Sequence, residues 1–391
     1  MTTTARAAVQ VADRRFEIEE FTLPHIGPDE GLLRVDACGM CGSDIEQYDG
    51  AFAALGVSYP LIPGHEPLGT IAEIGADASR RWGVQVGDRV AVEPLLGCGS
   101  CRACLLGDYR LCKGGAAGAA INAYGYLPAG FAPGLWGGYA EYMYLAPRTI
   151  VHKLSDDLPI ELAALYQPMA AGMRWFAHDS GVKAGDTVVV LGCGQRGLCG
   201  VVAAREAGAG RVIVTGLAKD AHKLELATAL GADHTVVADE QDTATAVAEH
   251  TGGEGADVVV DVTAVSTQPI VDAVEIAKPG ATIVLAGVKG SGQTVTGLAP
   301  DKLVTKELTL KGLWSQDIRA FEPALRLIES RRYPLERMHT QTYGLEDVAQ
   351  AVETLAGRVA GGGGSPRHGR AASRVSDRLS GQADVEGPQH R

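Results

Sequence analysis

Residues 185–216 read GDTVVVLGCGQRGLCGVVAAREAGAGRVIVTG, and this stretch decides the fold class. Its run 188–191 is short and wholly apolar, which is typical of a strand buried on both faces of a parallel sheet. A G-x-G-x-x-G pattern follows, with its glycines at Gly192, Gly194 and Gly197. A helical apolar spacing and a second strand-like run, 211–215, come next. This order predicts a dinucleotide-binding unit whose helix N-terminus receives a pyrophosphate.

The alternation of strand and helix patterns continues beyond this unit. Helical and strand-like segments take turns over 221–230, 234–237, 242–250, 256–263, 268–277 and 281–288. Such alternation predicts an α/β fold with a doubly wound parallel sheet and right-handed crossovers. The residues expected to contact the cofactor at the turn are Gly192, Gly194, Gln195, Arg196, Gly197 and Leu198.

The end of the second strand bears on the choice of cofactor. An acidic residue there would hydrogen-bond the ribose 2′-hydroxyl of NAD. This chain instead has Gly216, with Lys219 and Lys223 close behind it. Without the carboxylate a 2′-phosphate is not repelled, so the sequence favours NADP over NAD. The alternative is that the two lysines only solvate the start of a helix.

Length and composition limit the class of protein. A chain of 391 residues predicts two domains, and 46% hydrophobic with 21% charged residues is typical of a soluble globular protein. The net charge of −12 argues against nucleic acid or an anionic membrane as the main partner. The N-terminal stretch lacks the pattern of a secretory signal, and no apolar run is long enough to span a bilayer. We therefore expect a cytoplasmic protein, in which thiols stay reduced.

Four of the eight cysteines lie in the stretch 98–112, CGSCRACLLGDYRLC. Reduced surroundings disfavour a disulfide knot, and the last gap of seven residues does not match a ferredoxin run. Buried packing is improbable for four cysteines in one glycine-bearing loop. The spacing predicts a closed, structural zinc site with the ligands Cys98, Cys101, Cys104 and Cys112.

A second set of ligand-type residues lies earlier in the chain. Cys41 in VDACGMCGSDIEQYDG and His65 and Glu66 in PGHEPLGTIAEIG each sit beside glycine next to an apolar stretch. Thiolate, imidazole and carboxylate are the ligands of catalytic zinc, which keeps one position open. A redox pair of Cys38 with Cys41 is the alternative. The pair lacks the aromatic-flanked helix start of a redox motif, and Ser43 and Asp44 follow at once, so we interpret Cys38 as a packing residue.

Taken together, CGMCGSD, GHEPLGTIAEIG, the four-cysteine loop, GDRVAVEP and the glycine-rich turn resemble the medium-chain, zinc-dependent alcohol dehydrogenases. The resemblance runs from about residue 7 to about residue 355 and is strongest to the branch of polyol, sorbitol and threonine dehydrogenases. It implies a Rossmann domain together with a split, mainly-β, GroES-like catalytic domain. It also implies two zinc ions per chain and a homodimer or homotetramer.

The resemblance assigns roles to individual residues. Cys41 and His65 correspond to catalytic zinc ligands, and Glu66 to a ligand that binds directly or exchanges with water. Where the family often has an E-P dipeptide this chain reads QP, so Gln167 would be a neutral further ligand. Ser43 corresponds to the hydroxyl that takes the substrate's proton, and Asp44 to the carboxylate that orients a ligand histidine. Glu46 stands where a histidine commonly passes the proton to solvent.

The same resemblance predicts the domain boundaries. We expect a catalytic domain over 1–157 with its zinc lobe at 97–113, a Rossmann domain over 158–314, and a return to the catalytic domain over 315–357. From 358 to 391 the chain has six Arg against two Asp and one Glu and no aromatic residue. Such a composition predicts a disordered tail, in place of the family's short closing strand. A functional basic arm is the other interpretation.

The expected activity is hydride transfer between a secondary alcohol or polyol and a nicotinamide dinucleotide, or the reverse reduction of a ketone or aldehyde. One alternative is the zinc-free quinone and enone reductase branch, which typically lacks the cysteine lobe and the GHE ligands. A second alternative is a dinucleotide-binding zinc protein with impaired catalysis. Gln167, Glu46 and the atypical tail would then mark the lost activity.

Overall fold

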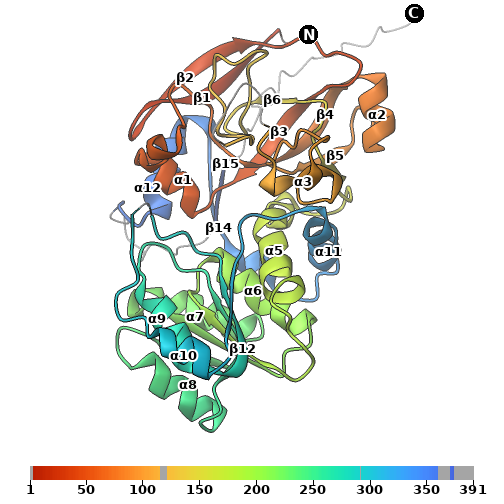
Figure 1. Ribbon diagram of the computed structural model, residues 1–391. Coiled ribbons are helices and arrows are strands. Elements are labelled where there is room, and N and C mark those ends of the chain that lie inside the picture. The colour runs from red at the N-terminus through yellow and green to blue at the C-terminus, as the bar shows by residue number, and fades with distance from the viewer. Residues whose placement is uncertain (1–2, 115–120, 291, 360–369, 374–391) are drawn as a thin grey trace, which may run out of the picture.

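Two units stacked on one another make up the chain in the computed structural model, with the mainly-β unit above the nucleotide-binding unit in Figure 1. The structure describes residues 3–114, 121–290, 292–359 and 370–373. The chain passes from the upper unit to the lower one and back, and both crossings run beside the cleft between the units. Among the described residues, no helix has the length and apolar character needed to cross a membrane.

The lower unit is built on a six-stranded sheet with the order β10-β9-β8-β11-β12-β13, in which every pair is parallel. Strand β8 lies in the middle, and the order reverses beside it, as in the doubly wound dinucleotide fold. The strands are β8 (Thr187–Leu191), β9 (Arg211–Gly216), β10 (His234–Val237), β11 (Ala256–Asp261), β12 (Ala277–Leu285) and β13 (Thr309–Gly312). The predicted α/β class is confirmed.

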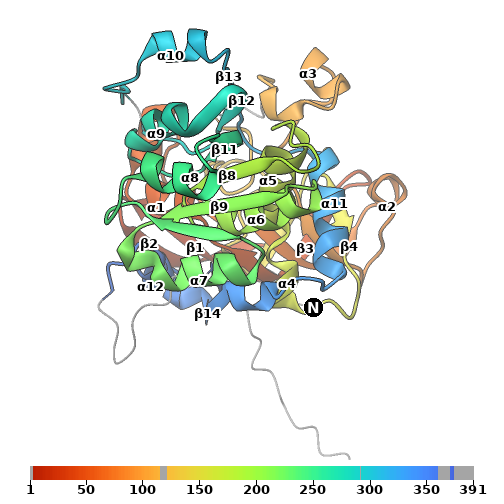
Figure 2. The same ribbon diagram turned by 90° about the horizontal axis from the view of Figure 1, so that it is seen from below.

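Helices cover both faces of this sheet (Figure 2). The side chains of β8 point alternately to the two faces and pack against different helices. Val188 and Val190 pack into a core with helices α5, α6, α7 and α11, whereas Val189 and Leu191 pack into a core with α8 and α9. Alternate residues of one strand thus serve two buried faces, which is why the run is wholly apolar. The helices are α6 (Gln195–Glu206), α7 (Ala221–Ala229), α8 (Thr243–Thr251), α9 (Gln268–Ile276) and α10 (Pro300–Thr305).

The upper unit holds a seven-stranded sheet with the order β14-β15-β3-β4-β5-β7, and β6 also pairs with β3. A separate hairpin, β1–β2, lies against it. The elements are β1 (Thr4–Ala12), β2 (Arg15–Thr22), β3 (Gly31–Gly39), α1 (Gly42–Tyr48), β4 (Glu66–Ile74), α2 (Ala76–Trp82), β5 (Arg89–Val92), α3 (Arg102–Leu105), β6 (Tyr142–Leu145) and β7 (Val151–Lys153). This is the GroES-like, mainly-β unit that the sequence predicts.

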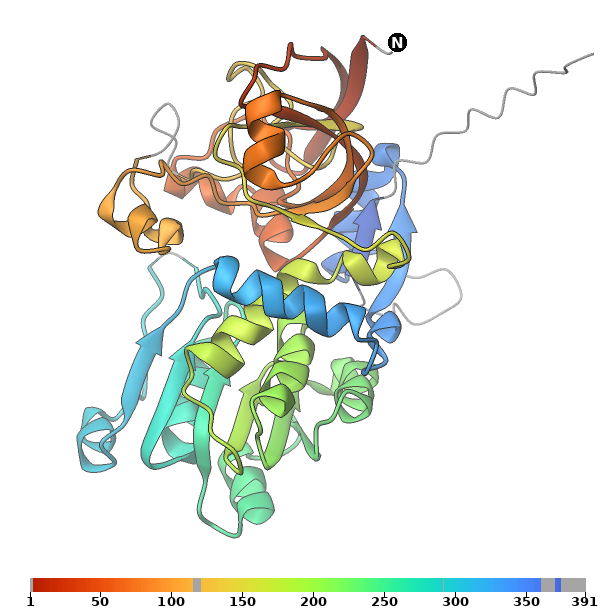
Figure 3. The ribbon, with the colours of Figure 1, turned by 90° about the vertical axis from the view of Figure 1, so that its right-hand side faces the viewer.

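The two crossings lie side by side in Figure 3. The first consists of α4 (Ile160–Ala163), α5 (Tyr166–Gly172) and the π-helix η4 (Met173–His178). The second begins with α11 (Ile318–Glu329) and continues through β14 (His339–Tyr343) and α12 (Val348–Leu355). Of the tail predicted over 358–391, the structure describes Arg358, Val359 and the strand β15 (Arg370–Ser373), which pairs with β14 and β3. The rest lies outside the described residues, and its disorder stays a prediction.

Candidate active site and metal centres

The register of β3 against β4 assembles the first metal centre. The two strands are antiparallel and pair Gly39 with Glu66, so the end of β3 lies beside the start of β4. Cys41 follows β3 directly as the N-cap of α1, and His65 immediately precedes β4. Residues that are more than twenty positions apart therefore meet at one edge of the sheet.

Cys41, His65 and Glu66 form a compact, buried donor set. Their ligand atoms all lie within 4.8 Å of one another, and Cys41 Sγ is 3.2 Å from His65 Nε2. The three residues are 1%, 5% and 0% exposed. One sulfur, one nitrogen and one oxygen in a buried pocket fit zinc with an open coordination position. The chain therefore has a catalytic-type zinc site here.

Asp44 sets the orientation of this centre. Its carboxylate accepts a hydrogen bond of 2.8 Å from the backbone N–H of Cys41 and lies 3.5 Å from His65 Nδ1. With Nδ1 facing Asp44, Nε2 faces Cys41, which is the arrangement of a metal-ligating histidine supported by a carboxylate. Burial alone would raise the pKa of Asp44, but the charge and hydrogen bond of His65, together with the hydrogen bond from the Cys41 backbone, outweigh it and hold that pKa below its ordinary value.

Cys41 is also favoured as a thiolate. Burial alone would raise the pKa of its thiol, but the positive charges of His65 and Arg196 outweigh burial and lower the pKa. The thiolate is the form that binds a metal. Arg196 Nη2 lies 3.7 Å from Cys41 Sγ, so this charge comes from the glycine-rich turn of the lower unit.

Gln167 reaches the same centre from helix α5. The Tyr166 hydroxyl donates to the carbonyl oxygens of Val92 at 2.7 Å and Pro67 at 3.1 Å, which fixes the helix against β4 and β5. Gln167 Nε2 in turn donates to the His65 carbonyl at 3.4 Å. Its Oε1 atom is buried and has no hydrogen-bond partner among the residues that the structure describes. A buried, unsatisfied amide oxygen beside the donor set suits a further, neutral ligand.

Ser43 and Glu46 lie on helix α1 at the mouth of the centre. Ser43 Oγ is 2.8 Å from Cys41 Sγ and 3.4 Å from His65 Nε2. Glu46 is partly buried, and burial raises its pKa although the charge of Arg196 opposes the shift. Both residues line a cavity of about 220 Å³ that also includes Gln195 and Trp175.

Tyr126 belongs to this site but was missed in the sequence analysis. Its ring centroid lies 5.5 Å from that of His65. The nearby Tyr124 is instead fully buried in the core, where its hydroxyl and that of Thr149 are 2.5 Å apart. The sequence carries no signal that separates these two tyrosines, because both lie in the same glycine-containing loop.

The four-cysteine loop forms the second metal centre. Cys101 Sγ lies 3.8 Å from Cys112 Sγ, and Cys98 Sγ lies 4.0 Å from Cys104 Sγ. Tetrahedral zinc with bonds of about 2.3 Å places its sulfur ligands about 3.8 Å apart. Hydrogen bonds from the backbone and side chain of Ser100 lower the pKa of the Cys98 thiol to about 5. Burial raises the pKa of the Cys104 thiol to about 12, so it is the spacing of the sulfur atoms that fits a closed, structural zinc site.

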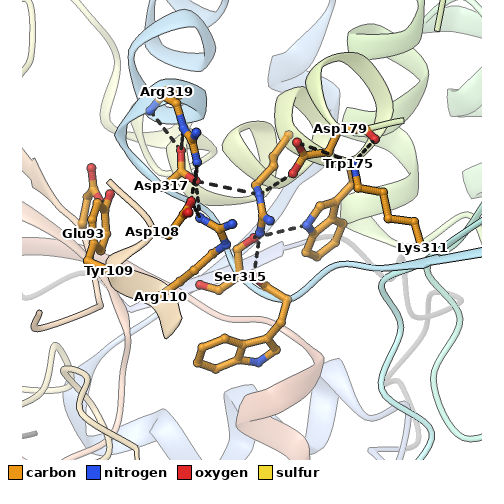
Figure 4. Close-up of polar contacts among 12 residues, drawn as sticks. Glu93, Asp108, Tyr109, Arg110, Trp175, Asp179, Lys311, Ser315, Asp317 and Arg319 are labelled. Atoms are coloured by element: carbon orange, nitrogen blue, oxygen red, sulfur yellow. Dashed lines mark hydrogen bonds and ion pairs between the residues drawn. The ribbon is translucent and has the colours of Figure 1, made fainter. Parts of the chain in front are cut away.

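Side chains of this lobe tie it to both units (Figure 4). The Tyr109 hydroxyl donates to the buried carboxylate of Glu93. Arg110 donates to Asp317 at 2.7 Å, and Arg319 donates to Asp108 at 2.9 Å. Because Asp317 directly precedes helix α11, the lobe is fastened to the chain where it returns to the upper unit.

The glycine-rich turn has the geometry of a dinucleotide site. Gly192 has φ of +106°, a conformation that other residues rarely adopt. A Cβ at Gly197 would meet the Gly192 carbonyl oxygen at 1.9 Å, whereas a Cβ at Gly194 would meet nothing within 4 Å. The turn is therefore closed on its inner side and open on the other, where Gly194, Gln195 and Leu198 line a cavity of about 730 Å³. This open side fits a pyrophosphate on the helix N-terminus.

The far end of that cavity bears on the cofactor's ribose. A Cβ at Gly216 would meet Cys193 Sγ at 2.6 Å and Leu224 Cδ2 at 2.9 Å, so a larger residue there would require these two side chains to shift. Lys219 is exposed, and Lys223 Nζ pairs with Asp220 at 2.7 Å. Lys223 lines the cavity together with Arg337, which the sequence analysis missed because it lies in the second crossing.

Comparison with known proteins gives concordant matches. Residues 27–156 match the family model of the alcohol dehydrogenase GroES-like domain, and residues 197–330 match that of the zinc-binding dehydrogenases. A probable alcohol dehydrogenase of Mycobacterium tuberculosis is 46% identical over 90% of this chain and 94% of its own length. An erythritol/L-threitol dehydrogenase of Mycolicibacterium smegmatis is 32% identical over 87% of this chain and 91% of its own.

Solved structures agree with these sequence matches. A putative zinc-binding dehydrogenase from Sinorhizobium meliloti, bound to NADP, superposes with a TM-score of 0.81 at 26% identity. The match covers 95% of this chain and all of the other, 100%. The two-unit fold is therefore shared with known proteins over nearly the whole chain.

Proposed function

Because this chain belongs to the medium-chain, zinc-dependent alcohol dehydrogenases and is an NAD(P)-dependent oxidoreductase acting on CH–OH groups, we propose that its substrates are secondary alcohols or polyols and that it prefers NADP. The observation that carries this proposal is the buried set of Cys41, His65 and Glu66 beside a cavity shared with the glycine-rich turn. That arrangement puts the metal centre and the cofactor cleft on two walls of one space.

Each of the bound groups supplies one part of the chemistry. Zinc at Cys41, His65 and Glu66 would supply Lewis acidity that makes an alcohol more acidic, and the nicotinamide would supply a hydride acceptor. The residues of the chain position these groups and move the proton. Asp44 keeps the His65 ring in place, and the Gln167 amide oxygen is available as a ligand without adding negative charge.

Ser43 is the group that receives the substrate's hydroxyl proton. Its Oγ atom lies at the edge of the donor set, 2.8 Å from Cys41 Sγ, and borders the cavity. Glu46 is on the same helix and borders the same cavity, so it is placed to pass the proton on. Its raised pKa makes it a better proton acceptor than an ordinary surface carboxylate.

The preference for NADP rests on the far end of the cofactor cavity. The chain has glycine at position 216, where an acidic side chain would select NAD. Lys223, which pairs with Asp220, and Arg337, which lies 4.0 Å from Glu225, line the same cavity and bring positive charge to a 2′-phosphate. Lys219 is exposed nearby.

Metal content and cofactor binding test this proposal first. We expect two zinc ions per chain, one for each ligand cluster, and tighter binding of NADPH than of NADH. Arg337→Gln should weaken NADPH binding while leaving NADH binding unchanged. Turnover of a secondary-alcohol and polyol panel should follow. One zinc ion per chain, or cofactor binding without turnover of any alcohol, would instead favour the catalytically impaired protein. A homodimer or homotetramer and a cytoplasmic location stay predictions.

A further inference from the structure

Arg196 is an unusual side chain to find at the metal centre. It is the second residue of helix α6, yet its guanidinium extends to 3.7 Å from Cys41 Sγ in the other unit. It also lies over the ring of Trp175, 5.3 Å from the centroid. A residue of the cofactor turn therefore places a positive charge directly beside the catalytic zinc ligands.

This charge has no ion-pair partner in the described part of the chain. Its guanidinium contacts the Cys41 sulfur and the Trp175 ring, and no carboxylate of the described residues lies within ion-pair distance, 4.0 Å. By contrast, Arg110, Arg174 and Arg319 nearby are all paired with aspartates. A guanidinium carries five N–H donors, so most of those of Arg196 remain available to a ligand in the cavity.

The Trp175 ring, over which Arg196 lies, is held by the network of Figure 4. Trp175 is buried, and its indole N–H donates to the Ser315 carbonyl oxygen at 3.2 Å. Arg174 donates to the same carbonyl at 2.6 Å and is itself paired with Asp179 at 3.0 Å. The ring beneath Arg196 is thus fixed, and a stacked, fixed guanidinium loses less freedom on binding than a mobile one.

The carboxylates around the centre leave the guanidinium of Arg196 without a direct partner. Zinc with Cys41 and Glu66 would be neutral, and the buried Asp44 faces His65 Nδ1 at 3.5 Å. Glu46 lines the same cavity as Arg196 but forms no ion pair with it. A carboxylate on the substrate would therefore be the first direct ion-pair partner of this guanidinium, whereas a neutral alcohol would leave it without one.

We propose that Arg196 binds an anionic group of the substrate, so that the preferred substrates are secondary alcohols with a carboxylate on the carbon next to the hydroxyl group. This proposal rests on the proposed dehydrogenase function and narrows its substrate class. The short distance from the guanidinium to Cys41 Sγ requires the charged group to be close to the reacting hydroxyl. A planar carboxylate also matches the guanidinium with two parallel hydrogen bonds. The cavity of about 220 Å³ restricts the ligand to a small one.

Matched substrate pairs test the proposal. Lactate and propane-1,2-diol share one carbon skeleton and differ in the carboxylate, and kcat/KM for lactate should exceed that for the diol by about tenfold or more. The pair of 3-hydroxybutyrate and butane-1,3-diol tests a carboxylate that lies one carbon further from the hydroxyl group. The pair of glycerol 1-phosphate and glycerol tests a phosphate in place of the carboxylate. A larger preference for the phosphate than for the carboxylate would overturn the assignment to hydroxy acids.

Binding without turnover gives a second readout. 2-Hydroxyisobutyrate is a tertiary alcohol that cannot be oxidised, and the same holds for its neutral amide, 2-hydroxyisobutyramide. Calorimetry on the zinc-loaded enzyme with NADP should show the acid binding at least about tenfold more tightly than the amide. Arg196→Gln should remove this difference, and Arg196→Lys should restore part of it. Arg326→Gln is the matched control, because Arg326 is exposed on α11 away from the cleft and its loss changes the net charge equally.

The outcomes separate this proposal from the dehydrogenase function on which it rests. If Arg196→Gln reduced the turnover of acids and of diols by the same factor, the proposal would be overturned. The same holds if it weakened NADPH binding by that factor, and Arg196 would then be assigned to the cofactor. Turnover of diols alone by the unmodified enzyme would also overturn it while leaving the dehydrogenase function intact. Binding of 2-hydroxyisobutyrate that depends on Arg196, without turnover of any alcohol, would support Arg196 as the anion site and contradict the dehydrogenase function.

Discussion

The two metal centres of this protein are built in opposite ways. The cysteine lobe takes all four ligands from fifteen consecutive positions, 98–112, and its cysteines stay partly exposed. The other centre takes Cys41 from the end of one strand and His65 and Glu66 from the start of the next, and all three are buried. The ligands of the first centre all come from one short loop, which makes it a local site. The second centre exists only when the sheet is formed.

This difference predicts separate consequences of losing each centre. Ligands buried at the edge of a folded sheet hold a metal that acts on the substrate, so their loss should affect activity more than folding. Ligands on a partly exposed loop hold the loop itself, so their loss should affect stability more than activity. Variants of single cysteines can test both halves of the comparison.

The largest effect is expected for Cys41→Ser. It removes a thiolate ligand from the buried centre, and a Lewis-acid metal supplies several kcal/mol of transition-state stabilisation. The rate should therefore fall by on the order of a thousandfold, at about 1.4 kcal/mol per factor of ten. Steady-state kinetics with metal analysis measures this, and the thermal unfolding midpoint should change little.

Cys38→Ala is the matched control in the same motif. Cys38 is fully buried and packs in the core of the upper unit. Its truncation should cost about 1 kcal/mol of stability and leave kcat within a few-fold of the original. If Cys38→Ala reduced turnover as strongly as is expected for Cys41→Ser, the two cysteines would act together. That result would favour the interpretation of Cys38 and Cys41 as a redox pair.

The cysteine lobe should respond to Cys112→Ser in the reverse manner. The variant should retain one zinc ion per chain and lose on the order of 4 kcal/mol of stability, a fraction of the roughly 10–16 kcal/mol that structural zinc supplies in small peptides. Denaturant unfolding and metal analysis measure the two effects. The folded fraction should keep most of its kcat. A loss of kcat as large as that of Cys41→Ser would remove the distinction between the two centres.

How far the sequence predicts each centre follows from the same contrast. The lobe follows from spacing alone, because four thiols on one short loop can only meet one another. Cys41, His65 and Glu66 were predicted as one ligand set from their residue types beside glycine, and the family resemblance then supported that set. Their meeting depends on the register of β3 and β4, which no local pattern reveals. Tyr126 and Arg337 were missed because they come from a loop and from the second crossing.

The fold itself was predictable to a greater extent than the site. The strand β8 is apolar at every position because both of its faces are covered, and this made the doubly wound sheet recognisable. The direction of one side chain was not predictable. Arg196 stands in the pattern of a pyrophosphate turn, yet its guanidinium contacts Cys41 and Trp175. Long side chains at the end of a helix can reach a neighbouring unit, and the sequence does not state which one.

A smaller effect is expected where the lobe meets the second crossing. Asp317 is buried and accepts hydrogen bonds from Arg110 and Arg319, so Asp317→Asn should cost about 3 kcal/mol of stability. Burial alone would raise the pKa of Asp317, but the hydrogen bond from Arg319 and the neighbouring arginine charges outweigh it and lower the pKa. A carboxylate with a lowered folded-state pKa contributes stability above its unfolded value, about 3.9, and loses it as the pH falls further.

Acid unfolding therefore distinguishes the charge of Asp317 from its packing. The stability of the unmodified protein should fall more steeply below about pH 4 than that of Asp317→Asn. Denaturant midpoints measured from pH 3 to pH 7 report the two slopes. Parallel curves would mean that the carboxylate is not charged in the folded protein, and the lobe would then be fastened by Tyr109 and the metal alone.

A still smaller effect than that of Asp317→Asn is expected for Tyr109→Phe, which removes the hydrogen bond from the lobe to Glu93, the residue after β5, without changing a metal ligand. Burial already raises the pKa of Glu93, while His152 at 2.8 Å and the Tyr109 hydroxyl oppose the shift. Without the hydroxyl the Glu93 pKa should rise further, and the lost hydrogen bond should cost about 1–2 kcal/mol. Zinc content should stay at two per chain, since all four cysteines remain. If this variant lost the zinc of the lobe, as is expected for Cys112→Ser, the loop would need the Tyr109–Glu93 hydrogen bond to hold its metal. The cysteine lobe could then no longer be called a local site.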